Sequence, residues 1–311
     1  MSCHGFRVPE NKFTVGDSAA GLIFLLSLSY YLPKGTKAMV DRLGKNPTYQ
    51  YEFIKVEQDD KAIMTVTLNR PEKRNAFTPA WHIELPEIFE KIHRDDRVRC
   101  VILTGAGKAF CAGGDVAAMA AATEDPMEKI LNWLRDVKKT VVRIMECDKP
   151  VIAKVNGAAV GLGSSLVAAC DVSFISDKAV IGDTHVKVGL TASDGGTALW
   201  GLHMGANRQK EYLWSGELMS GQRAAEIGLC NYCVPEAELD RKVQEFAEML
   251  ASQPPRAVQW TKRAINAPLI NQVSANFDTA VPLEVITAVS EDHVEASRAL
   301  REKRRGVFKG R

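Results

Sequence analysis

The chain has 311 residues, of which 46% are hydrophobic and 25% charged, a composition typical of a folded globular protein. The length allows one large domain or two smaller ones, and the formal net charge of +2 gives no reason to expect a nucleic-acid partner. Seven cysteines at irregular spacing favour a reducing compartment over a disulfide framework, so we expect a cytoplasmic protein.

The first 48 residues form an extension ahead of the main domain. Residues 19–32 (AAGLIFLLSLSYYL) are apolar, but this run is shorter than the roughly 20 residues that a membrane-spanning helix needs. Asp17 stands where a signal peptide would carry basic residues, and no small-residue cleavage site follows the run. We therefore expect a packed or interfacial helix over residues 19–32 rather than contact with a membrane.

Strand patterns begin directly after this extension. β-branched, partly alternating runs over 53–56 and 63–68 are separated by a polar turn, which predicts a hairpin. A polar loop over 69–76 follows. Thr78 is then expected to cap a helix that continues to about His93.

Short apolar strands and helices alternate in the next part of the chain. We expect strands over 99–104, 151–155 and 172–176, and helices over 126–145 and 162–169. Each crossover between strands contains one helix, which is the signature of β-α-β units with parallel pairing. The sequence therefore predicts an α/β fold.

The remainder of the chain is predicted to be mostly helical. The expected helices cover 209–215, 220–227, 236–252, 255–267 and 291–307. Helices gathered at the C-terminus suit a subdomain used for oligomer contacts or as a lid. We accordingly divide the chain into an N-terminal extension (1–48), a core (49–250) and a C-terminal helical subdomain (251–311).

Two glycine-rich turns follow strands and open helices, at residues 108–115 (KAFCAGGD) and 156–165 (NGAAVGLGSS). Glycine leaves main-chain N–H groups unshielded and permits unusual dihedral angles, so amides can point into a cavity. Two such amides can stabilise the oxyanion that develops on a carbonyl oxygen. Glycine pairs alone would favour tight turns that only allow close packing, because such pairs are common.

The order of the motifs favours the catalytic interpretation. The succession NRPxxxNA, VILTGxGKAFCAGGD, KPVIAxVNGxAxGxG and LxxACD resembles the enoyl-CoA hydratase/isomerase, or crotonase, superfamily, and the likeness extends from about Tyr51 to Lys309. The resemblance implies a spiral of ββα units with a C-terminal helical region that trimerises. It also implies a homotrimer, or a homohexamer built from two trimers.

The same resemblance implies site residues. The two oxyanion-hole amides fall on Gly114 and Leu162. CoA is expected as part of the substrate rather than as a separate cofactor, and no metal ion is expected. Contacts to CoA and the substrate would fall on Lys73, Arg74, Ala109, Phe110, Ala112, Ser165, Phe308 and Lys309.

Both glutamates that handle water in the family's hydratases are missing. Ser165 and His185 occupy their places, so hydration by a pair of carboxylates cannot be carried over to this chain. His185 and Asp194 remain as candidates, because they could meet across a short loop and Asp194 could orient His185 as a base. Asp194 could instead, or also, cap a helix that begins near Gly196, and His185 could be a buried core residue.

Three functions stay open at this point. The leading one is an acyl-CoA enzyme of the hydratase/isomerase type, which acts on an enoyl-CoA or related thioester by stabilising an enolate. The spacing of His185 and Asp194 also resembles that of the family's carbon–carbon bond hydrolases of the 6-oxocamphor hydrolase type, which cleave β-diketones. A dienoyl-CoA isomerase places an aspartate near the Asp194 position but a glutamate at that of His185. The third possibility is a non-catalytic CoA-binding relic.

Overall fold

The computed structural model describes residues 47–115 and 126–311, with the backbone alone over 126–135. The apolar run over 19–32 lies outside these residues. Thr48–Arg311 fold as one compact unit. Of the helices described in that unit, none combines the length and the apolarity needed to cross a bilayer.

The larger of two sheets contains six strands in the order β1-β2-β3-β5-β7-β10. The first two strands form the antiparallel hairpin that the alternating pattern predicted, and the others join in parallel, also as predicted. The strands are β1 (Ile54–Gln58), β2 (Ile63–Leu68), β3 (Cys100–Gly105), β5 (Val151–Val155), β7 (Val172–Ser176) and β10 (Tyr232–Val234).

From the larger sheet the chain passes repeatedly into a smaller sheet of four short strands. Its order is β4-β6-β8-β9, with β4 (Ala109–Cys111) after β3, β6 (Ala158–Val160) after β5, β8 (Val180–Gly182) after β7, and β9 (Met219–Ser220) antiparallel to β8. Two strands and a returning helix therefore repeat along the chain, which is the ββα spiral of the crotonase fold. The short strands were not predicted, because two or three residues beside glycines show no readable alternation.

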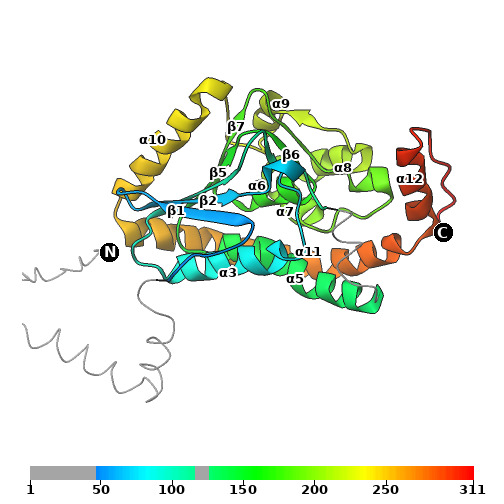
Figure 1. Ribbon diagram of the computed structural model, residues 1–311, viewed down its shortest axis with the longest axis horizontal. Helices are drawn as coiled ribbons and strands as arrows, with labels where there is room; N and C mark the ends of the chain where they lie inside the picture. The colour runs from blue at the N-terminus through cyan, green and yellow to red at the C-terminus, as the bar shows by residue number, and fades with distance from the viewer. Residues whose placement is uncertain (1–46, 116–125) are drawn as a thin grey trace, which may run out of the picture. The chain divides into compact units, whose positions relative to one another are not determined.

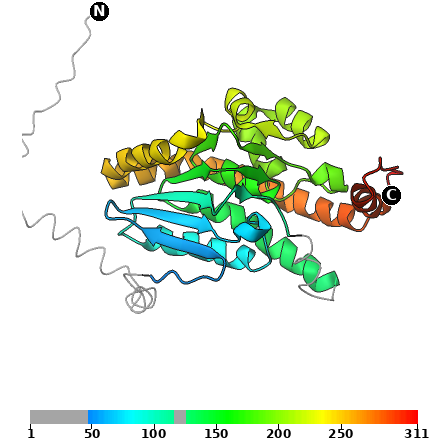
Figure 2. The same cartoon turned by 45° about the horizontal axis from the view of Figure 1, so that its top comes forward.

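Helices cover both faces of the larger sheet (Figures 1 and 2). Neighbouring residues of β3 face opposite ways, as the pleat requires. Ile102 packs in the cluster under α10 (Leu239–Ser252), whereas Val101 and Leu103 belong to the main core together with side chains from α3 (Trp81–Arg94) and α5 (Pro126–Glu146). The shorter helical elements are η1 (Pro71–Lys73), α6 (Leu162–Ala169), η2 (His185–Val188), α7 (Gly196–Met204), α8 (Ala206–Ser215), α9 (Gly221–Glu226) and η3 (Glu236–Glu238).

The two last helices differ from the sequence prediction. The helix α11 covers Pro255–Ala288 and does not end at 267, although Pro268 and Pro282 lie inside it. Proline removes a helical hydrogen bond, but Phe277 and its neighbours pack into the main core and hold the helix together across both prolines. The helix α12 covers Glu291–Arg301 and ends before 307, because Lys303 turns to a left-handed φ of 52°.

The cap predicted for α3 was also wrong. Its N-cap residue is Ala80, which provides no side-chain hydrogen bond, and the Thr78 hydroxyl is buried without a partner in the described structure. Ser220, by contrast, caps α9 by accepting a hydrogen bond from the Arg223 amide (3.2 Å).

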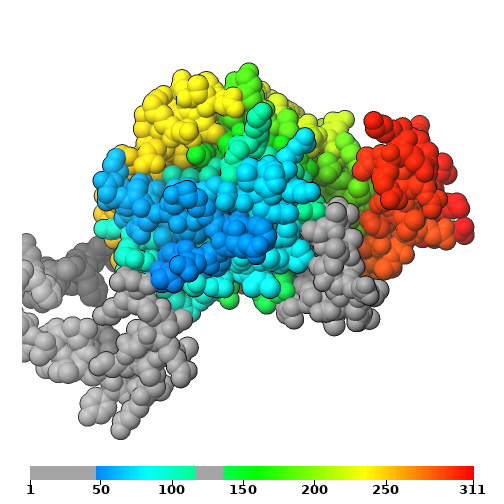
Figure 3. Space-filling view, in the orientation of Figure 1, coloured from blue at the N-terminus to red at the C-terminus, as the bar shows by residue number. Residues whose placement is uncertain are grey.

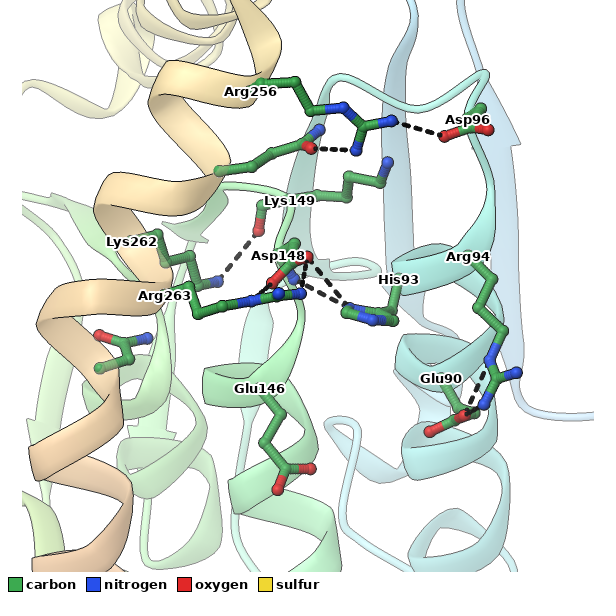
Figure 4. Close-up of polar contacts among 12 residues, drawn as sticks. Glu90, His93, Arg94, Asp96, Glu146, Asp148, Lys149, Arg256, Lys262 and Arg263 are labelled. Carbon is green, nitrogen blue, oxygen red and sulfur yellow. Dashed lines mark hydrogen bonds and ion pairs between the residues drawn. The ribbon is translucent and has the colours of Figure 1, made fainter. Parts of the chain in front are cut away.

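Polar side chains join α11 to the chain between α5 and β5 (Figure 4). Arg263 binds the carboxylate of Asp148, whose own N–H donates to Nδ1 of His93. The buried Lys262 amine lies 2.7 Å from the Asp171 carboxylate and 3.0 Å from the Lys149 carbonyl oxygen. These contacts fix α11 against the sheet, and the C-terminal half of that helix then extends toward α12 at the far edge of the unit (Figures 1 and 3).

Candidate active site

Gly114 pairs with Phe77 in a β-bridge, but the main-chain amide of Gly114 points away from Phe77. Phe77 donates its N–H to the Gly113 carbonyl oxygen (2.7 Å) and accepts from the Asp115 N–H (2.8 Å), which is a parallel bridge centred on Gly114. Because main-chain groups alternate in direction along an extended strand, the Gly114 N–H faces the opposite side. It donates to no residue that the structure describes, so it is available to an external oxygen.

Leu162 offers a second available amide. It is the first residue of α6, and the first N–H groups of a helix have no partner inside that helix. Gly161 precedes it with φ 54° and ψ −123°, a conformation that other residues rarely adopt. The N–H groups of Ser164 and Ser165 both donate to the Gly161 carbonyl, whereas that of Leu162 donates to no residue of the described chain.

Gly161 also marks where the two turns and the candidate side chains meet. A methyl group placed on its Cα would lie 3.5 Å from Cε1 of His185, 3.9 Å from Oδ2 of Asp194 and 3.9 Å from Cα of Gly113. The structure therefore brings both glycine turns, His185 and Asp194 into one site, as the sequence predicted. A side chain at Gly161 would enter the space between these groups.

His185 follows β8 and opens η2, and a neighbouring carboxylate fixes its ring. Its Nδ1 lies 2.7 Å from Oδ1 of Asp183, and the Asp183 carboxylate also accepts from the His185 main-chain N–H (3.0 Å). Asp183 is almost fully buried. Asp183 rather than Asp194 therefore orients the imidazole, so the orienting role assigned to Asp194 from the sequence was misplaced.

Asp194 faces the other nitrogen of the ring. Its Oδ2 lies 3.5 Å from Nε2 of His185, and its Oδ1 accepts a hydrogen bond from the buried Ser165 hydroxyl (3.2 Å). Asp194 does not cap α7, whose N-cap is Gly195 without a side-chain hydrogen bond. Ser165 thus positions the Asp194 carboxylate.

Glu284, on α11, is a third carboxylate in this cluster. Its Oε1 lies 4.0 Å from Nε2 of His185, while its Oε2 accepts a hydrogen bond from the Ser193 hydroxyl. Only 6% of the residue is exposed. Sequence reasoning missed both Glu284 and Asp183. The pattern Asp183-Thr184-His185 gave a local signal for Asp183, but nothing local points to a glutamate near the C-terminal end of a distant helix.

Burial and mutual repulsion shift the protonation of this cluster. Burial and the charges of Asp183 and Glu284 raise the pKa of Asp194, while the charge of His185 and the hydrogen bond from Ser165 lower it, and together they leave that pKa at about 7. Burial alone would lower the pKa of His185, but the surrounding carboxylates outweigh it and raise that pKa well above its usual range. Burial likewise raises the pKa of Glu284. The imidazole is therefore held as a cation, and Asp194 exchanges its proton near neutral pH.

The residues expected to contact CoA lie in three places. Lys73 and Arg74 are exposed in the loop after β2, and the Arg74 carbonyl accepts from the Ala112 N–H (3.1 Å), which ties this loop to the Gly114 turn. The Phe110 side chain is fully buried in the core and the adjacent Ala109 is buried as well, so their main chain is the part available to a ligand.

Phe308 and Lys309 are exposed in the C-terminal tail, which folds back onto α12. The Lys309 N–H donates to the Asp292 carboxylate (2.7 Å), and α12 contacts η2 through His293, whose Nδ1 lies 2.6 Å from the Val188 carbonyl oxygen. The tail therefore lies on the helix that packs against the His185 segment. Within the described chain, no hydrogen bond or ion pair joins this tail to Lys73 or Arg74.

Comparison with known proteins identifies the family. The family model described as enoyl-CoA hydratase/isomerase matches residues 58–311. The chain belongs to the enoyl-CoA hydratase/isomerase family. It is 33% identical over 261 residues to the 1,2-epoxyphenylacetyl-CoA isomerase of Escherichia coli (84% of this chain, 99% of the relative). It is 37% identical over 232 residues to the human mitochondrial Delta(3,5)-Delta(2,4)-dienoyl-CoA isomerase (71% and 70%).

Other members of the enoyl-CoA hydratase/isomerase family resemble the chain to a similar degree. The short-chain-enoyl-CoA hydratase of Clostridium acetobutylicum is 32% identical over 261 residues, covering 80% of this chain and 95% of the relative. The crystal structure of an enoyl-CoA hydratase/isomerase from Mycobacterium paratuberculosis superposes with a TM-score of 0.75 at 35% identity, covering 81% of this chain and all of that one. The protein is therefore a crotonase-superfamily enzyme of the acyl-CoA class.

Proposed function

We propose that the protein is an acyl-CoA isomerase that moves a proton between two carbon atoms of an enoyl-CoA or related thioester. The amides of Gly114 and Leu162 stabilise the enolate oxygen, and Asp194 carries the proton. The observation that carries this proposal is the buried Asp194 carboxyl group, whose pKa is raised to about 7 and whose Oδ2 lies beside Gly161 in the oxyanion turn.

The chemistry needs one group that both accepts and returns a proton. Removal of a proton from the acyl chain places negative charge on the thioester oxygen, where two main-chain amides stabilise it. Protonation at another carbon then completes the isomerisation without consuming water. A group works best in both directions when its pKa lies near the working pH, and Asp194 meets this condition.

His185 supports this reaction as a cation rather than as a base. Its pKa is raised well above the usual range by the carboxylates around it, so it holds its proton at neutral pH. A positive charge next to Asp194 stabilises the ionised carboxylate that starts the reaction. Ser165 positions Asp194 and supplies no carboxylate of its own, which disfavours hydration by a glutamate pair.

Two relatives with isomerase names support the proposal, namely the Escherichia coli and the human proteins. The hydratase from Clostridium acetobutylicum is about as similar, so identity alone does not select the reaction. The side chains favour isomerisation, because Ser165 and His185 stand at the two positions where the hydratases of this superfamily are expected to carry glutamates.

Hydrolysis of a carbon–carbon bond is a second candidate, favoured by one observation. The Asp183 carboxylate at Nδ1 of His185 has the geometry with which acidic residues orient a catalytic histidine. It ranks second because Nε2, the nitrogen that would activate water, faces two further carboxylates that keep it protonated.

A panel of enoyl-CoA, dienoyl-CoA and CoA-free β-diketone compounds, analysed by mass, separates these functions. Isomerisation predicts products of unchanged mass from the CoA esters alone. Gain of water by the CoA esters would replace the proposal with hydration. Cleavage of a diketone would establish the second candidate.

We further propose that Lys73 and Arg74 bind the phosphates of CoA and that the protein forms a homotrimer or homohexamer. Both basic side chains are exposed beside the Gly114 turn, and guanidinium and ammonium groups pair well with phosphate. Exposed apolar side chains on α11 and α12 support the assembly. They are Leu283, Ile286, Val294 and Leu300, with Val289 between the helices.

A further inference from the structure

The loop after β2, residues 69–76, lies along the turn that presents the Gly114 amide. The Arg74 carbonyl oxygen accepts from the Ala112 N–H (3.1 Å), and Phe77, directly after the loop, pairs with Gly114 in the β-bridge. The Gly114 turn is thus built against this loop, and its position depends on how firmly the loop itself is held.

Asn75 holds the end of this loop from inside the core, where its side chain is fully buried. The side-chain amide donates to the carbonyl oxygens of Ala106 (2.9 Å) and Ala109 (2.8 Å), and Oδ1 accepts from the Arg70 N–H (2.9 Å). Arg74 and Asn75 have left-handed φ values of 51° and 54°. That conformation costs free energy in residues other than glycine and persists only where other contacts fix it. The loop is therefore a rigid support for the turn.

The Arg70 side chain connects this support to the far end of the turn. Its Nη1 donates to the Ala76 carbonyl oxygen (2.8 Å), and its Nη2 lies 3.2 Å from Oδ2 of Asp115. The guanidinium carbon also lies 5.3 Å from the centre of the Phe53 ring, within the range of a cation–π contact. Only 12% of the Arg70 side chain and 14% of the Asp115 side chain are exposed, so solvent screens this ion pair weakly.

Two consecutive glycines give the turn little order of its own, so its neighbours have to supply it. Gly113 has a φ of 92°, and neither it nor Gly114 has a side chain that could pack. The loop holds these glycines at both ends, through the main-chain bond to Ala112 before them and through Arg70 at Asp115 after them. An amide stabilises an oxyanion strongly only when it is already aimed at the place where the charge develops.

We propose that Arg70 is a positioning residue, which aims the Gly114 N–H at the substrate carbonyl through its ion pair with Asp115. This role deepens the proposed function and rests on it, because it assumes that Gly114 is an oxyanion donor. Arg70 acts on the amide and not on the substrate, since its guanidinium group is occupied by Ala76 and Asp115.

The test is infrared difference spectroscopy of the full chain with hexanoyl-CoA, a saturated ester that cannot isomerise, labelled with ¹³C at its carbonyl carbon. Hydrogen bonds from the two amides weaken the C=O bond, so the carbonyl band of the bound ester should lie below that of the free ester. Arg70→Gln displaces one of the two donors, and we expect about half of this shift to remain. In turnover assays kcat should fall by about 10²-fold. The affinity for hexanoyl-CoA, measured by calorimetry, should change little.

Asp115→Asn is the second variant, because it removes the ion pair but keeps the main-chain bond from the Asp115 N–H to Phe77. It should reduce the carbonyl shift as Arg70→Gln does, and the double variant should lose no more than either single one, since both remove the same contact. Arg263→Gln is the matched control. It breaks another ion pair with a largely buried carboxylate, that of Asp148, but in the contact of α11 with the sheet. It should keep the full carbonyl shift.

Thermal unfolding establishes that each variant is folded. An unshifted carbonyl band in the unmodified protein would overturn the oxyanion hole and with it the proposed function. A shifted band there, with the same shift in folded Arg70→Gln and Asp115→Asn, would overturn the positioning role alone. An equal loss of the shift in Arg263→Gln would also overturn that role, because the effect would then follow stability and not the turn.

Discussion

The carboxylate of Asp183 lies 2.7 Å from Nδ1 of His185, and this contact gives Asp183 and Asp194 different roles in the cluster. It fixes the imidazole from one side and turns Nε2 toward Asp194 on the other. Asp194 is thereby free of the orienting role and can act on the substrate. The site combines two available amides, a fixed cation and a carboxyl group that titrates near neutrality.

Replacing the proton carrier should abolish turnover without abolishing binding. Asp194→Asn keeps the shape of the side chain and the contact with Ser165 but removes the basic oxygen. We expect kcat to fall by about 10²- to 10⁴-fold, the usual contribution of a general acid–base group. CoA-ester affinity, measured by calorimetry, should change little. Asp240→Asn, at an exposed position, is the control and should leave kcat unaltered.

The pH profile should report the shifted carboxyl group. Asp194 must be ionised to accept a proton, so kcat/KM should rise as the pH passes upward through about 7. Glu284→Gln removes a negative charge that raises the pKa of Asp194, so the rise should move to lower pH. The exposed Glu291→Gln should leave the profile in place. A profile that is flat from pH 5 to 8 in the unmodified protein would contradict this assignment.

Much of this arrangement could be predicted from the sequence, and the failures have physical causes. The hairpin and the parallel strands followed from periodicity, because strands such as 151–155 carry apolar residues that must be buried. The contact between His185 and Asp194 was expected from their spacing. The course of α11 was not, since a proline normally ends a helix and only tertiary packing around Phe277 outweighs it at Pro268. Glu284 was missed for the same reason, because it lies in the part of α11 beyond that proline.

Activity should not survive a side chain at Gly161, the residue that precedes the proposed oxyanion-hole amide of Leu162. Gly161→Ala places a methyl group 3.5 Å from Cε1 of His185 and forces alanine into a left-handed φ. We expect kcat/KM to fall by about 10²- to 10³-fold, as when an oxyanion donor is lost. Gly205→Ala is the matched control, since its φ is 80° but no atom lies within 4 Å of the added methyl group. It should lose about 1–3 kcal/mol of stability and keep its activity. Equal losses of activity in the two variants would argue against a specific role for Gly161.

The Lys262 contacts should contribute strongly to stability. Lys262→Met removes the amine that pairs with the Asp171 carboxylate and binds two main-chain carbonyl oxygens. Figure 4 shows one of these contacts, with Lys149. Loss of one partner of a buried ion pair costs about 3–5 kcal/mol in the free energy of unfolding. Urea unfolding measures this value. Arg256→Gln, which breaks an exposed pair with Asp96, should cost no more than about 1 kcal/mol.

The exposed apolar residues of α11 should lie in the subunit interface. Ile286→Asp places a charge on a side chain that is 63% exposed in the isolated chain. In an assembly this charge would be buried without a partner, so we expect light scattering to show a shift from trimers or hexamers toward monomers. Ile83→Asp, on α3, has a similar exposure and should leave the mass of the assembly unchanged. A monomeric unmodified protein would contradict the proposed assembly.

The most direct test of the proposed chemistry is turnover of the CoA-ester panel in D₂O, with products analysed by mass. The account predicts isomerised products that gain no water and that carry deuterium in place of hydrogen where Asp194 exchanges the proton it has removed with D₂O before it returns one. It also predicts that Asp194→Asn binds the same esters and forms neither product nor deuterated substrate. Addition of water to the esters, cleavage of a CoA-free diketone, or undiminished deuterium incorporation by Asp194→Asn would contradict it.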